Sequence, residues 1–257
     1  MRSLQRGLAA YAHVLRQPGC SFTELRQATG LSKAVTHRIL AELERSGFLW
    51  RALSDGRYWP RSHPVPVDEP RAALAQRRLA EASVEPLLEL NAALVWPSDV
   101  FTFSGTGMRL LESSRRRSPF LMNPEAIGRE VDALPTAVGR AYLGALGPRA
   151  LARALAQMRA DGSYARQAAL CADDPEAAIA LAGRQGHAFR DPAFLGQDGR
   201  DDGIQGLAVP IPGRRGPLGA VNVVWIRSAL TQDAAHAAWL APLQACAAAI
   251  ARRHARS

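Results

Sequence analysis

Lysine and cysteine are scarce in this sequence. Of its 32 basic residues, Lys33 is the single lysine and the remaining 31 are arginines. Arginine carries a planar fork of donors that contacts phosphates and carboxylates in pairs, so the basic charge suits such partners. The three cysteines, Cys20, Cys171 and Cys246, lie far apart with no CxxC spacing. This excludes a disulfide framework, gives no zinc-binding pattern and fits a cytoplasmic protein.

The sequence also lacks a long, strongly apolar run. Residues 1–19 include basic groups but no apolar core followed by a small-residue cleavage site, so we expect no secretory signal. The most apolar stretch, 234–251, is rich in alanine and is interrupted by His236, Pro242 and Gln244. It falls short of the roughly 20 apolar residues that a membrane span needs. We therefore predict a soluble C-terminal helix and no membrane partner.

Hydrophobic residues make up 47% of the 257 residues, which is enough for a globular protein of one large or two modest domains. The formal charge is +9, and residues 1–64 contain 10 basic and 4 acidic groups, so most of the excess lies there. Such a balance predicts an anionic partner, with nucleic acid, acidic lipid or an acidic ligand as the candidates. Three prolines in 61–70 place a boundary there. We predict domains at 1–62 and 85–257, joined by a linker and linker helix at 63–84, with the helix running from Asp68 to about Ser83.

Three helical patterns and a hairpin follow one another in the first domain. Leu4, Leu8, Ala9, Ala12 and Leu15 share one face of a helix that stops at Pro18-Gly19. Ser21 and Glu24 form a capping box for a second helix that Gly30 closes. A third helix, capped by Ser32, buries Val35, Ile39, Leu40 and Leu43 and ends at Gly47. Residues 48–53 and 57–59 flank Ser54-Asp55-Gly56, where an Asp-Gly pair is typical of a tight hairpin.

Helix, helix, turn, helix and hairpin within about 60 basic residues is the pattern of a winged helix-turn-helix module. The buried stripe of the third helix leaves its N-terminal end facing outward, where such helices meet base edges in the major groove. There Lys33 and His37 could read guanine, and Thr36 could contact a thymine methyl. The residues expected to contact phosphates are Ser32, Arg38, Arg45, Arg51 and Arg57. A small helical core with a solvated basic face is the alternative, but the caps, the turn, the hairpin and the local charge favour binding to double-stranded DNA.

The motifs also resemble a known family. SLQRGL, SFTELRQATGLSKAVTHRILAELERSGFL and DGRYWP are similar to the DNA-binding domain of IclR-family bacterial transcriptional regulators. Further on, WPSDVFTF, IGREVDALPTAVGRAYLGAL and GLAVPIPGRRGPLGAVNVVWIRSALT resemble that family's effector domain, particularly in members that control aromatic-acid catabolism. The ordered set covers nearly the whole chain. The resemblance implies a linker helix that packs against its counterpart in a dimer and a GAF-like ligand-sensing domain.

Beyond the linker helix, strands and helices alternate in an α+β pattern. We expect strands at 100–103 and 109–112, a hairpin of strands at 206–211 and 218–226, and a new helix start at Pro86. Helices are expected at 135–146, 148–159, 174–185 and 232–253. The predicted fold class is therefore α+β, with a winged helix-turn-helix domain followed by a GAF-like domain.

Two places in the second domain are candidates for effector contacts. In the last strand Asn222 and Val224 share a face on which Asn222 is the lone polar group, so it needs a partner: the backbone or a bound effector. The resemblance aligns both residues with the family's effector contacts. In Leu134-Pro-Thr-Ala137 a proline in the first turn leaves the amides of Thr136 and Ala137 at a helix start, where a carboxylate or only water could bind.

Enzyme chemistry has little support in the sequence. GxSxG, HExxH, GxGxxG and P-loop motifs are absent. Cys171 and His187 could be imagined as a nucleophile and a base, but no orienting partner is evident. Asp198, Asp201 and Asp202 are read as an acidic loop rather than a cation site. We predict no catalytic residues, no metal and no cofactor.

The sequence thus predicts a cytoplasmic transcriptional regulator that binds palindromic operator DNA as a homodimer or homotetramer, with a small, aromatic carboxylic acid as effector. Effector binding would shift the population of DNA-competent arrangements. Two alternatives stay open. One is an enzyme acting on an acidic metabolite and fused to a basic module; the other is an architectural DNA-binding protein with an inert dimerisation domain.

Overall fold

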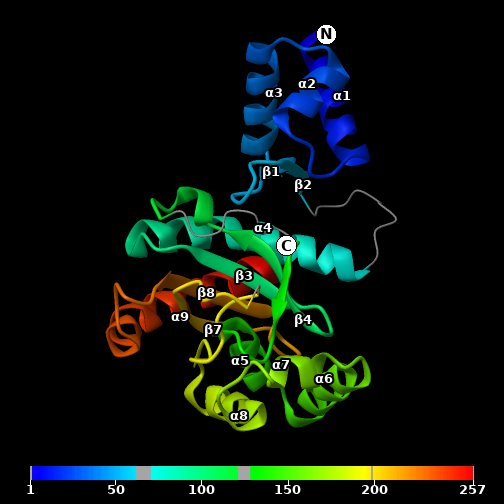
Figure 1. The fold of residues 1–257 in the computed structure, drawn as a ribbon. Coiled ribbons are helices and arrows are strands. Elements are labelled where there is room, and N and C mark those ends of the chain that lie inside the picture. Colours follow the sequence, from blue (N-terminus) through cyan, green and yellow to red (C-terminus); the bar gives the residue numbers. More distant parts are fainter. Residues whose placement is uncertain (1, 62–70, 121–127, 198, 257) are drawn as a thin grey trace. The chain divides into compact units, whose positions relative to one another are not determined.

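A computed structural model describes residues 2–61, 71–120, 128–197 and 199–256 (Figure 1). The chain divides into two compact units, 1–81 and 82–256. The first part of the predicted linker, 63–70, lies outside the described residues.

The first unit is a three-helix core with a two-stranded wing. Its elements are α1 (Arg2–Arg16), α2 (Phe22–Thr29), α3 (Lys33–Arg45), β1 (Leu49–Arg51) and β2 (Tyr58–Pro60). Ser21 caps α2 in a capping box with Glu24, and Gly30 ends it in the left-handed conformation at φ 64°. Ser32 caps α3 by accepting a hydrogen bond from the Val35 amide. The predicted helix starts and the tight turn between α2 and α3 are therefore present.

The buried face of α1 differs from the prediction. Ala10 and Val14 are fully buried in the core, whereas Leu4 and Leu8 are 69% and 58% exposed. The core that receives α1 contains Leu25, Leu40, Leu49 and Tyr58. Apolar residues occur on two neighbouring faces of this helix, so helical spacing alone does not identify the face that packs.

The wing is an antiparallel pair in which Trp50 lies opposite Trp59. Of the predicted Asp-Gly turn, Gly56 has a positive φ of 73° and Asp55 does not. The turn is therefore looser than the two-residue type in which both central residues have positive φ.

Helix α4 (Arg71–Leu94) runs through Pro86 without a new start, which corrects the predicted break. Proline removes one helical hydrogen bond and disfavours a helix interior by about 3 kcal/mol. Leu87 is fully buried and Leu90 nearly so, and this packing offsets the penalty. The division between the two units falls within α4, after Glu81.

The second unit is built on a six-stranded antiparallel sheet with the order β5-β4-β3-β8-β7-β6. The strands are β3 (Ser98–Phe103), β4 (Gly107–Ser113), β5 (Glu130–Asp132), β6 (Ala188–Phe189), β7 (Ile204–Ile211) and β8 (Gly219–Ile226). The helices are α5 (Ala137–Gly144), α6 (Pro148–Ala160), α7 (Ser163–Ala168), α8 (Pro175–Gln185) and α9 (Gln232–Arg256), with a short 3-10 turn η1 at Arg115–Arg117. The predicted α+β class is confirmed; β5, β6 and α7 had not been predicted.

The two faces of the sheet are covered by different helices (Figure 1). Asn222 and Val224 of β8 lie on the face that α5 covers, whereas Trp225 lies on the other face, where its ring meets Trp239 of α9 edge-on at 5.3 Å. The face under α5 is the one that contains the cavity described below.

By length and composition α9 could cross a membrane. In this structure it packs on β7 and β8 and buries Trp239, Leu243 and Ile250. A helix that covers a sheet in this way meets the same compositional test, so the feature is weak evidence for a membrane span.

Candidate functional site

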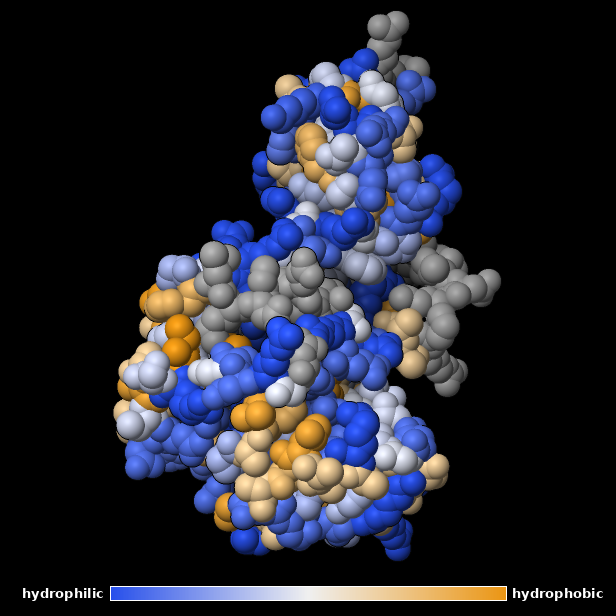
Figure 2. Space-filling view, in the orientation of Figure 1, coloured by the Kyte–Doolittle hydropathy of each residue, from blue (hydrophilic) through white to orange (hydrophobic). Residues whose placement is uncertain are grey.

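The N-terminal end of α3 presents a basic surface. Lys33, His37 and Arg38 are exposed, and neither Lys33 nor Arg38 forms a hydrogen bond or ion pair with a described residue. His37 lies against the ring of Phe22, with ring centroids 4.3 Å apart, so this contact restricts its orientation. Hydrophilic residues cover much of the visible surface of this unit (Figure 2). The predicted outward orientation of these three side chains agrees with their exposure; a base contact stays a prediction.

Thr36 does not belong to this surface. It is 1% exposed, and its hydroxyl donates to the Ser32 carbonyl at 3.0 Å. Residues three and four positions apart share a helix face, so Thr36 lies with Ile39 and Leu40, which are both buried. The prediction that Thr36 contacts a base is wrong, because its side chain is part of the core.

The predicted phosphate contacts fall into two groups. Arg38 projects into solvent, and Arg45 is exposed beside Glu42, with which it forms an ion pair. Ser32 is exposed, but its hydroxyl is used as the cap of α3. These side chains remain accessible to a duplex.

The two arginines of the wing instead make contacts within the unit. The Arg51 Nε donates to the Gly56 carbonyl at 2.9 Å, and its guanidinium lies 5.5 Å from the centre of the Tyr58 ring. Arg57 donates to the Gly19 carbonyl at 2.6 Å and to Glu24 at 3.2 Å. Arg57 therefore joins the wing to the start of α2, a structural role that the sequence did not indicate.

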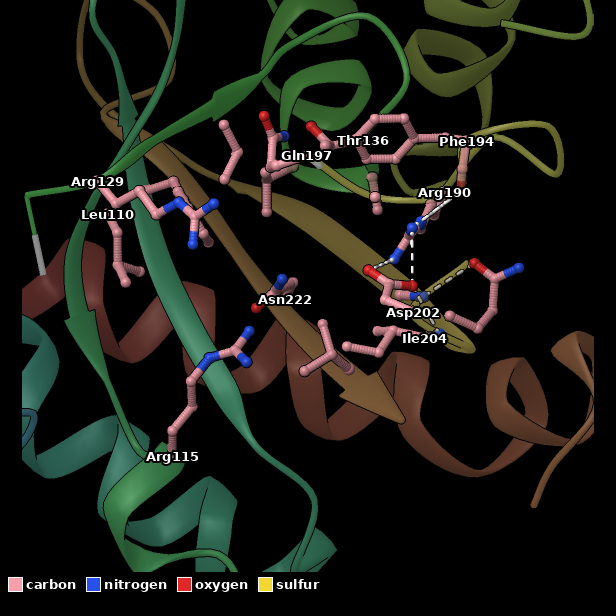
Figure 3. A pocket seen from close by; sticks show the side chains of 18 of the residues that line it. Leu110, Arg115, Arg129, Thr136, Arg190, Phe194, Gln197, Asp202, Ile204 and Asn222 are labelled. Atoms are coloured by element: carbon pink, nitrogen blue, oxygen red, sulfur yellow. Dashed lines mark hydrogen bonds and ion pairs between the residues drawn. The ribbon is translucent and has the colours of Figure 1, made fainter. Parts of the chain in front are cut away.

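The second unit contains a cavity of about 250 Å³ between the sheet and the first turn of α5 (Figure 3). Its apolar walls include Phe101, Leu110, Phe194, Ile204 and Val224. Four arginines and one aspartate also line it: Arg115, Arg129, Arg190, Arg200 and Asp202. A cavity with apolar walls and an excess of cations suits an organic anion.

The first turn of α5 contributes backbone donors to this cavity. Thr136 caps the helix: its hydroxyl accepts from the Gly139 amide and donates to the Asp132 carbonyl at 2.5 Å. The amides of Ala137 and Val138 have no hydrogen-bond partner among the described residues. Thr136, Ala137 and Val138 all line the cavity. The free N–H groups and the helix dipole make this a place for a negative group.

Leu134, also predicted as an effector contact, is fully buried and is not among the residues that line the cavity. Its side chain belongs to the hydrophobic core under α5. Its carbonyl accepts from the Arg140 Nε at 2.8 Å. The contact prediction for Leu134 is therefore wrong, because the residue supports the loop from inside.

Asn222 lines the cavity from β8 and is 6% exposed. Its Oδ1 accepts from the Asp99 amide at 2.9 Å, whereas its Nδ2 has no hydrogen-bond partner among the described residues. The sequence left two partners open, the backbone and a bound effector. The backbone takes the oxygen, and the nitrogen stays available to the cavity.

Asp99 connects Asn222 to Arg115. The fully buried Asp99 carboxylate accepts from the Arg115 Nε at 2.9 Å, from its Nη2 at 2.8 Å and from the Ser113 hydroxyl at 2.7 Å. Burial alone would lower the pKa of Arg115, but the Asp99 carboxylate outweighs it and raises that pKa above its usual value. Arg115 is thus a permanent cation beside the cavity. Sequence spacing does not reveal this partner, because Asp99 lies 16 positions before Arg115.

The remaining candidates do not form a catalytic or metal site. The Cys171 thiol donates to the Gln167 carbonyl, and the His187 ring contacts the Gln185 carbonyl, Phe189 and His236, so the two are not paired with each other. Burial raises the pKa of Cys171, which disfavours a reactive thiolate. Asp201 pairs with Arg227 and Asp202 with Arg190, while Asp198 lies outside the described residues. Within the described ranges no group of three potential metal ligands occurs.

Known proteins resemble this chain in two ways. Residues 3–51 match the model of the IclR helix-turn-helix domain. In fold, the chain is similar to a protein described as a transcriptional regulator from Rhodococcus sp. RHA1, with 21% identity, a TM-score of 0.54, and coverage of 100% of this chain and 98% of the other. It is also similar to the Thermotoga maritima IclR, with 17% identity, a TM-score of 0.54 and 99% coverage of both chains.

A third similar structure is an IclR homolog complexed with 4-hydroxybenzoate, from Microbacterium hydrocarbonoxydans. It shares 16% identity with this chain, has a TM-score of 0.53, and the match covers 98% of this chain and 100% of the other. At such identities the likeness is one of fold. It extends over the whole chain, whereas the family match extends over the helix-turn-helix.

Proposed function

We propose that this chain is an IclR-family transcriptional regulator that binds operator DNA through the α3 surface and a small carboxylic acid in the cavity of the second unit. The observation that carries the proposal is the match of residues 3–51 to the IclR helix-turn-helix domain. The exposed, basic N-terminal end of α3 supports it, since helices of this kind enter the major groove with their first turns.

Lys33 and His37 are the side chains that we expect to read base edges. A lysine or a protonated histidine can donate to guanine N7 and O6, and both side chains are exposed on the same end of α3. Arg38 and Arg45 lie farther along the same helix and suit phosphates. With Thr36 in the core, direct readout rests on two side chains rather than three.

The effector class follows from the lining of the cavity. Aromatic and aliphatic walls favour an apolar body, and the amides of Ala137 and Val138 favour a carboxylate. An aromatic acid combines the two features. The fold relative that is complexed with 4-hydroxybenzoate supports this class.

Operator palindromes require two recognition helices related by a two-fold axis, so we propose a homodimer or homotetramer acting in the cytoplasm. An effector that binds the DNA-competent and DNA-incompetent arrangements unequally would shift their populations. The enzyme alternative is not favoured, because Cys171 and His187 are not paired. An architectural protein would have the same α3 surface but a DNA affinity independent of any acid.

The test is a selection of binding sites from a pool of random duplexes, followed by fluorescence anisotropy on the selected site with and without benzoate and 4-hydroxybenzoate. We expect a palindromic site and an affinity that changes with an acid. Equal affinity for selected and scrambled duplexes would refute the regulator. A specific but acid-independent affinity would favour the architectural protein.

A further inference from the structure

Asn222 offers its amide nitrogen to the cavity. Its Oδ1 is held by the Asp99 amide, which fixes the orientation of the side chain. The Nδ2 has no partner among the described residues, although the side chain is more than nine-tenths buried and lines the cavity. The nitrogen itself is accessible from the cavity, where water can accept its hydrogens, so a ligand that displaces this water must supply an acceptor in its place. The ligand group beside Asn222 is therefore an acceptor.

The first turn of α5 is a second, separate set of donors. The amides of Ala137 and Val138 are without described partners, and in an N-terminal turn they favour an anion. No acceptor of the helix itself can reach them, because the amides of the first turn lack an intrahelical partner. A ligand that satisfies the cavity thus meets donors at two places.

Along β8, Asn222 and the start of α5 are separated by about two residues. A Cβ placed on Gly206 would lie 3.8 Å from the Ala137 Cβ, so α5 begins above Gly206. Gly206 pairs with Val224, which follows the same-face position Asn222 by two residues along β8. Residues two apart on a strand are separated by about 7 Å. Figure 3 shows Asn222 and Arg115 on one side of the cavity and Thr136 on the other.

The space between these donors has an apolar wall, and the lining has more cations than anions. Val224 lies at the α5 end of the cavity, Ile204 lies beyond it on β7, and Phe101 also lines the cavity. Arg115 is adjacent to Asn222 through their shared partner Asp99. Asp99 neutralises Arg115, but the four arginines of the lining still exceed Asp202 and Asp99 together by two charges. The cavity as a whole therefore favours a ligand with two negative charges.

We propose that the effector is an organic diacid with an apolar body, whose carboxylates accept hydrogen bonds from the α5 amides at one end and from the Asn222 Nδ2 at the other. This inference rests on the proposed function, since it names the ligand of the same cavity. A monoacid without a second acceptor leaves the Asn222 donor to water. An acid with an ammonium group at its far end places a donor against the Asn222 donor.

Three benzoates that differ in their para substituent test the proposal by isothermal titration calorimetry on the full chain without DNA. They are benzene-1,4-dicarboxylate, benzoate and 4-(aminomethyl)benzoate. We expect the diacid to bind at least about tenfold more tightly than benzoate, and the aminomethyl compound to bind most weakly. Benzoate binding as tightly as the diacid would overturn the inference.

Asn222→Asp supplies the decisive variant, because it keeps the size of the side chain and an oxygen for the Asp99 amide while removing the donor. It should abolish the preference for the diacid and favour 4-(aminomethyl)benzoate, with its cationic end. Gln185→Glu, an equivalent change at an exposed position of α8, should leave the order of affinities unchanged. A diacid preference that persists in Asn222→Asp would overturn the assignment.

The outcome is separable from that of the proposed function. If the diacid has no advantage but benzoate still alters DNA affinity, the inference fails and the regulator stands. If none of the three acids binds, the inference and the acid effector both fail. DNA binding is then judged by the duplex selection alone.

Discussion

Arg140 and Asp191 form a buried ion pair that joins the first turns of α5 to the loop after β6. The Arg140 Nε also donates to the Leu134 carbonyl, and the Asp191 carboxylate accepts from the amides of Ala172 and Ala193 at 3.0 and 2.8 Å. The Asp191 amide in turn donates to the Pro135 carbonyl at 2.9 Å. This network holds the start of α5 and the loop after β6 in position relative to each other. Neither Arg140 nor Asp191 lines the cavity.

Removal of one partner of this pair should be strongly destabilising. Asp191→Ala leaves the Arg140 charge buried and unpaired, so we expect the free energy of unfolding of the second unit to fall by about 3–5 kcal/mol. Urea titration, with hydrogen-exchange mass spectrometry to assign the transition to residues 82–256, measures the change.

The matched control is the exposed pair of Arg159 and Glu176. Glu176→Ala should lower the free energy of unfolding by no more than about 1 kcal/mol, because water screens an exposed pair. A loss of similar size in the two variants would show that Arg140 and Asp191 do not form the central contact.

Arg38 and Arg57 should differ in their effect on DNA binding. Arg38→Ala removes an exposed cation and should reduce the slope of log affinity against log salt concentration by about 1. Arg57→Ala removes a tie between the wing and Gly19, so it should chiefly lower the melting temperature. Anisotropy at a series of salt concentrations, together with thermal unfolding, distinguishes the two. Equal changes in salt slope would contradict the assignment.

Lys33→Ala and His37→Ala should each weaken binding to the selected site by about 1–3 kcal/mol and relax the preference at one base position. Thr36→Val is the contrast, since the Thr36 hydroxyl faces the Ser32 carbonyl inside the unit. It should leave sequence preference intact. A change of base preference in Thr36→Val would show that Thr36 contacts the DNA after all.

His187 should make the second unit less stable in acid. Burial, and secondarily the neighbouring His236, lowers the pKa of His187 below its usual value, despite the hydrogen bond to the Gln185 carbonyl, which raises it. The unfolded chain then binds more protons than the folded one as pH falls through about 6.5. The contribution of His187 to stability is therefore complete above that pH and is lost below it.

His187→Gln should reduce this pH dependence. Comparison of urea unfolding at pH 7 and pH 5 in the wild-type chain and the variant isolates the contribution of one proton, which is at most about 1.4 kcal/mol per pH unit. Identical pH profiles in the two proteins would show that His187 keeps an ordinary pKa.

Helices α5 and α8 pack closely at Gly144 and Gly183, and this contact predicts the effect of adding a side chain there. A Cβ on Gly144 of α5 would lie 2.7 Å from the Gly183 amide nitrogen and 2.8 Å from the Ile179 carbonyl oxygen of α8. Backbone atoms cannot move aside cheaply, so Gly144→Ala should destabilise the second unit by about 1–3 kcal/mol. Gly7→Ala, where a Cβ meets nothing within 4 Å, should stabilise α1 instead. Thermal unfolding of both variants checks the contrast.

Helix ends and the central strand β8 were predicted correctly where short-range sequence patterns mark them. Ser21 with Glu24, Ser32 and Gly30 mark helix ends through contacts within a few residues, and the alternation of 219–226 marks a central strand. Short strands such as β5 and β6 have no such signal, because pairing with distant strands alone creates them.

The candidate sites were predicted less completely for the same reason. Asn222 stood out as the lone polar residue on an apolar face. Pro135 indicated the start of α5 two residues early: it precedes the N-cap Thr136 and is not in the first turn. The free first-turn amides are therefore those of Ala137 and Val138. The roles of Arg115, Arg140 and Arg57 depend on partners 16 to 51 positions away, which sequence spacing does not reveal. Thr36 is buried although it is polar, because it shares a helix face with Ile39 and Leu40 and its hydroxyl is satisfied by the Ser32 carbonyl.

Arg140 also supports the start of α5 from outside the cavity. The Val138 amide is free because it lies in the first turn of the helix, while the Arg140 Nε holds the Leu134 carbonyl three residues before that helix begins. Ligand affinity should therefore depend on a guanidinium that does not line the cavity, because it positions the segment that leads into the donor amides.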